Sequence, residues 1–538
     1  MKSASRLIGF AVVDLFVCSS LTSCDSSGSR ADLVILNGAE PESIDPAVIT
    51  GQLDGRVAYA LFDGLVHFDR HGVPQPAIAR SWNLSSNATT YTFHLRSNAK
   101  WSNNEPVTAN DFVESWKRTL LPETAAEYAY VMYHIKNAQA FNEGKIKDFS
   151  LVGVHALDAQ TLRVELEDPT PYFLDLLAYV PYLPVYIPSV KQFGDDWIKP
   201  AHLVNDGPFL MEEWRLNYRI RLRKNPNYWD AQNVRLQTVD LLPIENAISA
   251  YNFYASKVAD LILDKGLTPP SLIPEIKHRP DFHAAPFLGD YFIRFNVTRK
   301  VFSDARVRQA FAMAIERKRI VQKITQAGEP PAYSFTPPGT AGYQPPEMFH
   351  FDPEKARQLL ADAGYPQGRG FPTVTYLYDN KKLNEDIAIE IQSMLWQELG
   401  VHVELQKQEW KVYLNSMNRR DYDFCRSSWI GDYNDPNTFL DCFVTNGGNN
   451  RTGWSNQEYD RLIEAAGKEA DQRKRFDYFR QAEDILLNQA TPICPLYFYM
   501  GIQIYDNAKL GGIEPNLLDE HPFREMYRKE DGALAVGR

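Results

Sequence analysis

The fold class is decided by residues 373–405, which read TVTYLYDNKKLNEDIAIEIQSMLWQELGVHVEL. Aromatic and β-branched residues predict a strand over Thr373–Tyr378 and a second strand over Val401–Leu405. Between them, helical spacing predicts a helix over about Asn384–Leu399, which Gly400 ends. A strand, a helix and a strand within about 30 residues form a βαβ unit, whose strands are parallel. The sequence therefore predicts an α/β protein with helices packed on a sheet.

Strands and helices alternate along the rest of the chain in the same way. Short strands are predicted at Leu33–Leu36, Tyr91–Leu95 and Leu162–Leu166. Helices are predicted to begin at three capping sequences, which are Thr108 with Asp111, Asp352 with Pro353, and Ser455 with Glu458.

The composition narrows the class of protein. A length of 538 residues corresponds to roughly three or four domains of ordinary size. The hydrophobic share of 44% and the charged share of 23% are typical of a globular protein. A net charge of −11 argues against a nucleic-acid partner, because such proteins need a surplus of Lys and Arg.

The first residues have the pattern of an exported bacterial lipoprotein. Two basic residues precede an apolar run over Leu7–Val17, which is too short to span a bilayer. Leu21–Cys24 resembles a lipobox, in which the Cys receives two acyl chains and becomes the first residue of the mature chain. We therefore expect residues 1–23 to be a lipoprotein signal peptide, and residues 24–32 to be the lipidated Cys24 and a tether. An ordinary signal peptide is the alternative.

Sequence motifs for catalysis and for cofactor binding are absent. There is no phosphate-binding loop, no nucleotide-binding glycine fingerprint, no nucleophile elbow and no H-E-x-x-H. Cys425, Cys442 and Cys494 have no C-x-x-C spacing and allow at most one disulfide. We expect a protein that is not an enzyme and that carries no cofactor and no metal.

A cluster of aromatic and charged residues lies between Trp410 and Asn450. Its rings are Trp410, Tyr413, Tyr422, Phe424, Trp429 and Tyr433, and its charges are Arg426, Asp432 and Asp435. Aromatic walls with a few fixed charges favour a concave small-molecule site, because rings provide burial and charges set orientation. A protein core with surface ion pairs is the alternative.

Ordered matches over nearly the whole mature chain resemble the bacterial periplasmic oligopeptide-binding proteins, which are solute-binding proteins (family 5) of ABC importers. They include Gln408–Lys411, Arg426–Pro436, Phe439–Leu440, Asn225–Trp229, Phe302–Arg308 and Leu359–Tyr365, with earlier matches at 44–46, 61–65, 79–82, 93–96, 100–102 and 107–112. The resemblance implies a periplasmic-binding-protein fold of type II with three lobes, in which two lobes close on a ligand at a hinge and an extra lobe is inserted. The expected boundaries are 33–62, 190–288 and 501–538 for lobe I, 63–189 for lobe II, and 289–500 for lobe III.

The resemblance also implies the partners. A short peptide would be captured in the closing cleft and delivered to an ABC permease, which separate ATPases drive. The protein would be a monomer in the periplasm or on the cell surface, anchored to the membrane by the lipid on Cys24. Asp25 resembles the inner-membrane retention signal of some Gram-negative bacteria.

The same resemblance gives roles to single residues. Asp432 would bind the α-ammonium of the ligand, because a buried ammonium needs a fixed carboxylate. Backbone groups near Ser428, Ile430 and Gly51 would pair with the peptide main chain and give affinity without reading side chains.

Other residues would line the ligand. Trp410 and Trp429 would form side-chain pockets, and Arg426 would receive a ligand carboxylate or orient Asp432. For Arg426 a purely structural ion pair is the alternative. The expected ligand-binding set is Asp432, Trp429, Trp410, Arg426, Ser428, Ile430, Gly51, Tyr433, Asn449, Tyr254, Asn384 and Met417.

The sequence departs from the family where relatives bind the carboxylate end of a peptide. Cationic residues of those relatives correspond here to Thr325, Asn384 and Met417. Arg419, Arg420 or Lys381 could replace the lost cations. If they do not, we expect a murein peptide, glutathione, a nickel complex or another small solute as the ligand. A cysteine pair that bridges near the site in some relatives is replaced by Gly289 and Ile430.

Overall fold

The computed structural model describes residues 30–529. The expected signal peptide, the expected lipidation site Cys24 and the last residues of the expected lobe I (530–538) lie outside the described residues.

Strands and helices alternate through the described chain. The strands are β1 (Leu33–Leu36), β2 (Val66–Phe68), β3 (Pro74–Pro76), β4 (Ala79–Leu84), β5 (Thr90–Leu95), β6 (Val154–Asp158), β7 (Thr161–Glu165), β8 (Phe209–Arg215), β9 (Arg219–Lys224), β10 (Thr238–Leu242), β11 (Leu261–Ile262), β12 (Phe282–Phe295), β13 (Val374–Asp379), β14 (Val403–Gln408), β15 (Phe424–Ile430), β16 (Ile493–Tyr505), β17 (Leu510–Gly511) and β18 (Tyr527–Arg528). The α-helices are α1 (Gln52–Leu61), α2 (Ala109–Leu120), α3 (Ala138–Asn142), α4 (Phe173–Leu177), α5 (Ile187–Phe193), α6 (Ala247–Ala255), α7 (Ile273–Ile276), α8 (Ala305–Ala314), α9 (Arg317–Ile320), α10 (Pro353–Asp362), α11 (Lys382–Leu399), α12 (Trp410–Asn418), α13 (Asn437–Leu440), α14 (Gln457–Lys468) and α15 (Gln472–Asp484).

The predicted βαβ unit is present and fixes one end of the main sheet. β13 and β14 pair in parallel, with α11 between them in sequence, as predicted. Gly400 ends α11 in the left-handed conformation (φ 68°). β14 begins two residues later than predicted, because the Val401 N–H still donates to the Leu395 carbonyl and so belongs to the end of the helix.

Two sheets organise the molecule. A ten-stranded mixed sheet has the order β14-β13-β15-β12-β16-β11-β1-β10-β9-β8, and a four-stranded sheet has the order β4-β5-β7-β6. The α/β class predicted from the sequence is confirmed by this mixed sheet and its helices.

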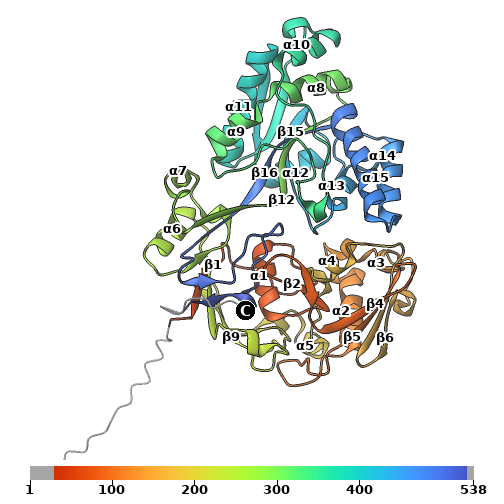
Figure 1. Ribbon diagram of the computed structural model, residues 1–538, viewed down its shortest axis with the longest axis vertical. Helices are drawn as coiled ribbons and strands as arrows, with labels where there is room; N and C mark the ends of the chain where they lie inside the picture. The colour runs from red at the N-terminus through yellow and green to blue at the C-terminus, as the bar shows by residue number, and fades with distance from the viewer. Residues whose placement is uncertain (1–29, 530–538) are drawn as a thin grey trace, which may run out of the picture.

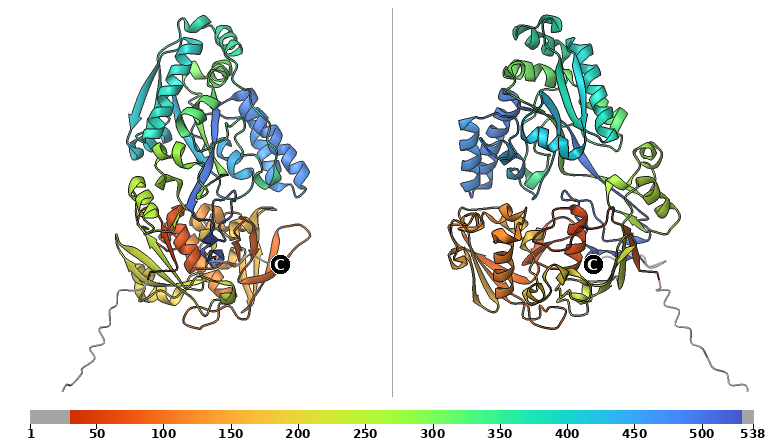
Figure 2. Two further views of the ribbon diagram at one scale, coloured as in Figure 1. Left: turned by 60° about the vertical axis from the view of Figure 1, so that its left-hand side comes forward. Right: turned by 180° about the vertical axis from the view of Figure 1, so that it is seen from behind.

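Two long strands join the upper and lower parts of the molecule. β12 and β16 run side by side between an upper part with β13–β15 and α8–α15 and a lower part with β1–β9 and α1–α5 (Figures 1 and 2). Their pairing shifts register between Pro286 and Asp290. Such an irregularity bends a strand, and it lies where the two parts meet.

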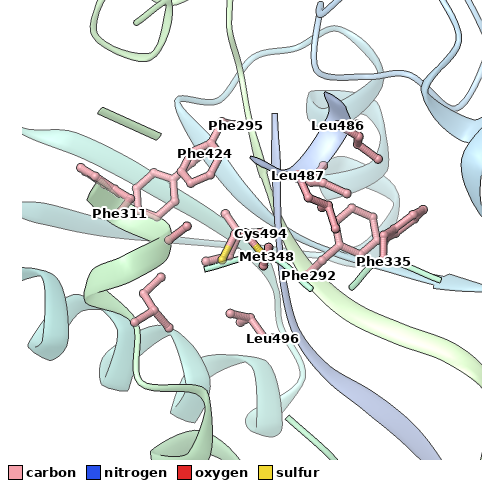
Figure 3. Close-up of a cluster of buried hydrophobic side chains, with 14 of the residues drawn as sticks. Phe292, Phe295, Phe311, Phe335, Met348, Phe424, Leu486, Leu487, Cys494 and Leu496 are labelled. Atoms are coloured by element: carbon pink, nitrogen blue, oxygen red, sulfur yellow. The ribbon is translucent and has the colours of Figure 1, made fainter. Parts of the chain in front are cut away.

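Three large hydrophobic clusters form the core, one in the upper part and two in the lower part. The largest runs from Leu288 to Tyr497 and fills the upper part, with stacked and edge-on phenylalanine rings around Cys494 (Figure 3). The other two fill the lower part, one mainly within residues 65–182 and one from residues 33–263 and 505–526. The lobe boundaries given above stay a prediction.

Local helix signals were predicted well, with one error. Thr108 and Asp111 form the capping box of α2, and Asp352 caps α10, as predicted. The prediction that Ser455 caps the next helix was wrong, because Asn456 caps α14 and accepts from the Tyr459 N–H. Both side chains suit a cap, so the residue type did not decide the position.

Candidate functional site

β15 and the loop after it carry the centre of the candidate site. β15 lies between β13 and β12, and it pairs antiparallel with β12 so that Ile430 faces Gly289. Arg426, Ser428 and Ile430 alternate onto one face of the strand, while Trp429 lies on the other. Ile430 is 55% exposed at the strand end.

Asp432 lies in a small cavity just beyond the strand. The cavity, which we call the Asp432 cavity, has a volume of about 80 Å³ and is lined by Tyr130, Val131, His134, Leu176, Trp429, Asp432, Tyr433, Thr438, Asp441 and Asn449. The Tyr130 hydroxyl donates to the Asp432 carboxylate at 3.4 Å, and the Asp432 N–H donates to the Thr438 Oγ1 at 3.0 Å. The upper and lower parts of the molecule therefore both contribute to the cavity.

Among the side chains that the structure describes, no Lys, Arg or His lies within ion-pair distance of the Asp432 carboxylate. Burial by the cavity walls raises its pKa to about 6, against the opposing effect of the Tyr130 hydroxyl. Burial and then the charge of Asp432 raise the pKa of the nearby Asp441 to about 7. The cavity therefore lacks a cation.

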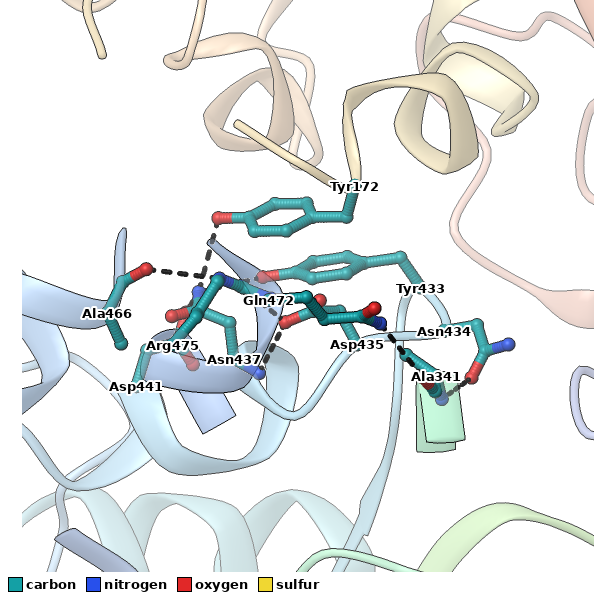
Figure 4. A network of polar contacts seen from close by, with 10 residues as sticks. All are labelled: Tyr172, Ala341, Tyr433, Asn434, Asp435, Asn437, Asp441, Ala466, Gln472 and Arg475. Carbon is teal, nitrogen blue, oxygen red and sulfur yellow. Dashed lines mark hydrogen bonds and ion pairs between the residues drawn. The ribbon is translucent and has the colours of Figure 1, made fainter. Parts of the chain in front are cut away.

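An aromatic stack closes one side of the Asp432 cavity. Tyr172 from the lower part stacks on Tyr433 with ring centroids 4.4 Å apart and an interplanar angle of 9° (Figure 4). The Asn437 side-chain amide donates to both hydroxyls, at 3.3 Å to Tyr172 and 3.1 Å to Tyr433. Because Tyr433 is the residue after Asp432, this stack holds the Asp432 loop against the lower part of the molecule.

A buried ion pair between Arg475 and Asp435 fixes the loop that carries Asp432. Arg475 of α15 makes two hydrogen bonds to Asp435, at 2.6 and 2.7 Å, and its third donor reaches the Ala466 carbonyl (Figure 4). Both side chains of the pair are buried. We call Arg475 and Asp435 the Arg475 anchor, and it fixes the loop that presents Asp432.

Two cations lie near β15, one on the strand itself and one on the Tyr499 ring beside Gly289 and Ile430. Arg426 is buried, with its guanidinium 5.3 Å from the Tyr291 ring centroid, and its Nε has no hydrogen-bond partner in the described residues. Lys265 holds its ammonium 3.5 Å from the Tyr499 ring centroid. We call Lys265 and Arg426 the hinge cations. Arg426 has no carboxylate within ion-pair distance in residues 30–529, so neither the expected pairing with Asp432 nor the alternative structural ion pair is present.

Two further expected ligand residues line the Asp432 cavity, and two others lie elsewhere on the described chain. Asn449 and Trp429 line the Asp432 cavity, and the buried Trp429 Nε1 has no partner in the described chain. Trp410 is 43% exposed and stacks on Tyr413, with the Lys381 ammonium 5.8 Å from the Trp410 ring centroid. Gly51 precedes α1 in an extended conformation.

Other expected residues have contacts of their own. Met417 is buried in a small cluster with Tyr413 and Cys425. Tyr254 donates to Asp281 at 2.9 Å and lines a separate cavity of about 490 Å³ beside Arg30. The structure thus does not bring Tyr254 together with Asp432.

Two of the three positions of the lost cations are bonded to acids. Asn384 donates to the buried Asp379, and Thr325 donates to Glu329 at 2.7 Å. These two positions therefore lie beside carboxylates where relatives were expected to carry positive charge.

The other candidates for replacement cations lie elsewhere or are already occupied. Arg419 donates to Asn415 at 2.9 Å, and Arg420 lines a further cavity beside Trp454. Cys425, Cys442 and Cys494 are free and buried, and Gly289 pairs with Ile430 in place of a disulfide.

Four residues of the site had no signal in the sequence. Tyr130, Tyr172, Lys265 and Tyr499 come from segments far from β15 and belong to no motif identified above. Sequence reasoning missed them because only folding brings them to the site.

The fold and this cleft-lining arrangement define an extracellular solute-binding protein. Residues 73–451 match the model of the bacterial extracellular solute-binding proteins, family 5 Middle, and the chain belongs to this family. It is 36% identical to the periplasmic oligopeptide-binding protein OppA of Salmonella typhimurium over 508 residues, which cover 93% of this chain and 92% of that protein. It is also 36% identical to the periplasmic murein peptide-binding protein MppA of Escherichia coli over 469 residues, which cover 86% of each chain.

A solved structure agrees with these sequence relatives. The Haemophilus influenzae OppA complex with the peptide RPPGFSPFR superposes with a TM-score of 0.78 at 31% identity, covering 93% of this chain and 99% of that one. The periplasmic-binding-protein fold and the oligopeptide-binding family expected from the sequence are thus confirmed. No helix within residues 30–529 is long and apolar enough to cross a bilayer.

Proposed function

We propose that this protein is a lipid-anchored receptor that captures short peptides by their amino end at Asp432 and delivers them to an ABC-type importer. The observation that carries the proposal is the partly buried Asp432 carboxylate, which has no positive partner in the described chain and a pKa raised to about 6. A ligand α-ammonium would supply the missing charge, because a charge-assisted pair in a cavity offsets the cost of burial.

The geometry around Asp432 supports an end-on fit. A cavity of about 80 Å³ has room for an ammonium group and its nearest atoms rather than for a whole peptide. The exposed end of β15 at Ile430 would pair with the peptide main chain by strand addition. Main-chain pairing gives affinity for many side chains, which suits an uptake receptor.

Membrane attachment through Cys24 is part of the proposal. Its support is the lipobox-like Leu21–Cys24, together with membership of a family whose relatives carry the word periplasmic in their names. Incorporation of radiolabelled palmitate or glycerol into the wild-type protein in cells, and its loss in Cys24→Ala, would test the anchor.

The amino-end contact is tested by a pair of ligands and a pair of variants. Trialanine and N-acetyl-trialanine are titrated against the purified wild type, Asp432→Asn and Asp441→Asn, with calorimetry as the readout. Removing a buried charge partner costs about 3 to 5 kcal/mol, so Asp432→Asn should bind trialanine more than a hundredfold more weakly. Asp441→Asn is the matched control and should retain most of the affinity. Equal affinity of wild type and Asp432→Asn for trialanine would refute the proposed contact.

A second ligand class is favoured by one observation. Asn384 and Thr325 bond to Asp379 and Glu329, so the groups with which relatives were expected to bind a peptide carboxylate are absent there. A murein peptide is a ligand of this class, and MppA supports it as a relative. Binding of murein tripeptide at least tenfold tighter than trialanine in the same titration would select it.

A further inference from the structure

A larger cavity, separate from the Asp432 cavity, lies at the edge of the molecule where β1 and α6 pack together (Figure 1). Its volume is about 490 Å³, and we call it the Arg30 cavity. Its walls come from the first described residue, the end of α6, the segment before β12, the turn after β16 and the strand β18. Segments from both ends of the described chain thus meet at this cavity.

Positive charge exceeds negative charge in the lining of the Arg30 cavity. The basic residues that line it are Arg30, Lys257, Arg279, Lys509 and Arg528. The acidic residues that line it are Asp260, Asp281 and Asp506. The whole protein carries a net charge of −11, so a cavity with more basic than acidic residues is an exception on an acidic protein. An anion is therefore the ligand whose charge fits.

Two arginines of this cavity share one carboxylate. The Arg30 guanidinium donates to one oxygen of Asp260 at 2.9 Å, and the Arg528 guanidinium lies 2.8 Å from the other oxygen. The remaining paired cations each have an acid of their own, because Arg279 pairs with Asp281 and Lys509 with Asp506. One positive charge is therefore left over at Asp260.

Lys257 adds a second unmatched charge. It lies just after α6, with a left-handed backbone (φ 64°), and it is exposed. Within residues 30–529 its ammonium forms no ion pair and no hydrogen bond. Its backbone carbonyl accepts from the Arg30 guanidinium at 3.2 Å, so the two residues are neighbours. The unmatched positive charge of the cavity therefore lies on the side formed by Arg30, Lys257 and Asp260.

This side of the cavity is close in sequence to the proposed lipid anchor. Arg30 is six residues after Cys24. A chain of that length spans at most about 22 Å when it is fully extended. A lipid on Cys24 would therefore hold the Arg30 cavity within about 22 Å of the bilayer, and a membrane with anionic lipids attracts basic residues near its surface.

We propose that the Arg30 cavity binds the phosphate of an anionic phospholipid headgroup and so turns this edge of the anchored protein toward the membrane. The inference rests on the lipid anchor of the proposed function, and it does not depend on the peptide site at Asp432. Guanidinium and ammonium groups bind phosphate oxygens by charge-assisted hydrogen bonds. The volume of about 490 Å³ lies within the usual range for a small-molecule site, roughly 300 to 1,000 Å³.

Chemical labelling of single lysines tests the proposal on the lipidated protein purified from cells. The protein is reconstituted in phosphatidylcholine vesicles with or without phosphatidylglycerol, and acetylation by an N-hydroxysuccinimide ester is followed by mass spectrometry. An ammonium that binds a phosphate reacts more slowly, because the anion favours the charged form over the free amine. Phosphatidylglycerol should therefore slow the acetylation of Lys257 and Lys509 at least threefold. The exposed Lys300 before α8 should react at the same rate in both vesicles.

Two double variants separate the cavity from the general charge of the protein. Arg30→Gln with Lys257→Gln removes the unmatched charge, so Lys509 should lose its protection by phosphatidylglycerol. Lys145→Gln with Arg163→Gln removes the same charge from exposed side chains elsewhere in the lower part, and Lys509 should stay protected. All four substitutions affect exposed side chains, and thermal unfolding checks that both variants are folded. Equal protection of Lys509 in the two double variants would overturn the proposal.

Three further outcomes would also count against it. If inorganic phosphate added to phosphatidylcholine vesicles protects Lys257 as well as phosphatidylglycerol does, the cavity binds free phosphate and the membrane assignment is wrong. If neither protects Lys257, the cavity is not an anion site. If the wild type incorporates no labelled palmitate, the anchor at Cys24 fails and the inference fails with it. A failed trialanine titration would instead refute the peptide site alone, so the two proposals can be told apart.

Discussion

The loop after β15 carries two carboxylates, Asp432 in the Asp432 cavity and Asp435 in the Arg475 anchor. Their surroundings differ in whether a positive partner is present. Asp435 is buried and receives two hydrogen bonds from Arg475. In the described chain the Asp432 carboxylate accepts a hydrogen bond only from the Tyr130 hydroxyl, and its pKa is raised to about 6. A paired buried charge here holds the loop in place, and an unpaired one three residues earlier is available to a ligand.

The hinge cations extend this comparison. Arg475 has a carboxylate partner within the protein, whereas Lys265 and Arg426 contact aromatic rings and form no ion pair within the described residues. Within the described residues, the Asp432 carboxylate and the cations Lys265 and Arg426 thus form no ion pair.

The largest expected effect is a loss of stability when the Arg475 anchor is broken. Arg475→Met should lower the free energy of unfolding by about 3 to 5 kcal/mol, because it leaves the Asp435 charge buried without a partner. Chemical denaturation measures this. Arg480→Met is the matched control on the same helix, since Arg480 forms an exposed pair with Asp477 and should cost at most about 1 kcal/mol. Equal losses in both variants would contradict the structural role assigned to the anchor.

The next effect concerns ligand affinity and pH. The Asp432 pKa is raised to about 6, so its ionised form, which binds an ammonium, is lost as the pH falls through 6. Affinity for trialanine should therefore weaken about tenfold between pH 7 and pH 5. Asp441 and Asp175, whose pKa values are each raised to about 7, face the same loop and add to the trend.

Two variants isolate the contribution of Asp432 to that profile. Asp432→Asn should bind weakly with little dependence on pH, whereas Asp441→Asn should keep most of the wild-type slope. A wild-type affinity that is constant from pH 7 to pH 5 would show that the Asp432 carboxylate is not the group that binds the ligand.

Contiguous segments of this protein could be predicted from sequence, and contacts between segments could not. The βαβ unit, the capping box of α2 and the Asp432 loop each lie within a few dozen residues, where spacing and residue type are informative. Lys265 gave no signal, because its contact with Tyr499 forms only on folding, where Gly289 leaves room for that ring.

The prediction of a single residue was wrong where two neighbouring residues suit the same role. Ser455 and Asn456 can both cap a helix, and the fold selects Asn456. The Tyr254 hydroxyl donates to Asp281 at a separate cavity, and its expected contact with the ligand stays a prediction. Residue type alone did not show which neighbour folding would supply.

The smallest expected effect tests how the lower part holds the Asp432 loop. Tyr172 stacks on Tyr433 with centroids 4.4 Å apart, and such a stack contributes about 0.5 to 1.5 kcal/mol beyond area burial. Tyr172→Leu should therefore weaken trialanine binding about two- to tenfold. The change should lie mainly in the dissociation rate, since most affinity differences between related complexes do.

Tyr172→Phe is the control, because it keeps the ring and loses the 3.3 Å contact between the Tyr172 hydroxyl and Asn437. Its kinetics should therefore stay close to wild type. Stopped-flow tryptophan fluorescence measures both rates. An unchanged dissociation rate in Tyr172→Leu would mean that the stack packs the loop without retaining the ligand, and the Arg475 anchor alone would then position Asp432.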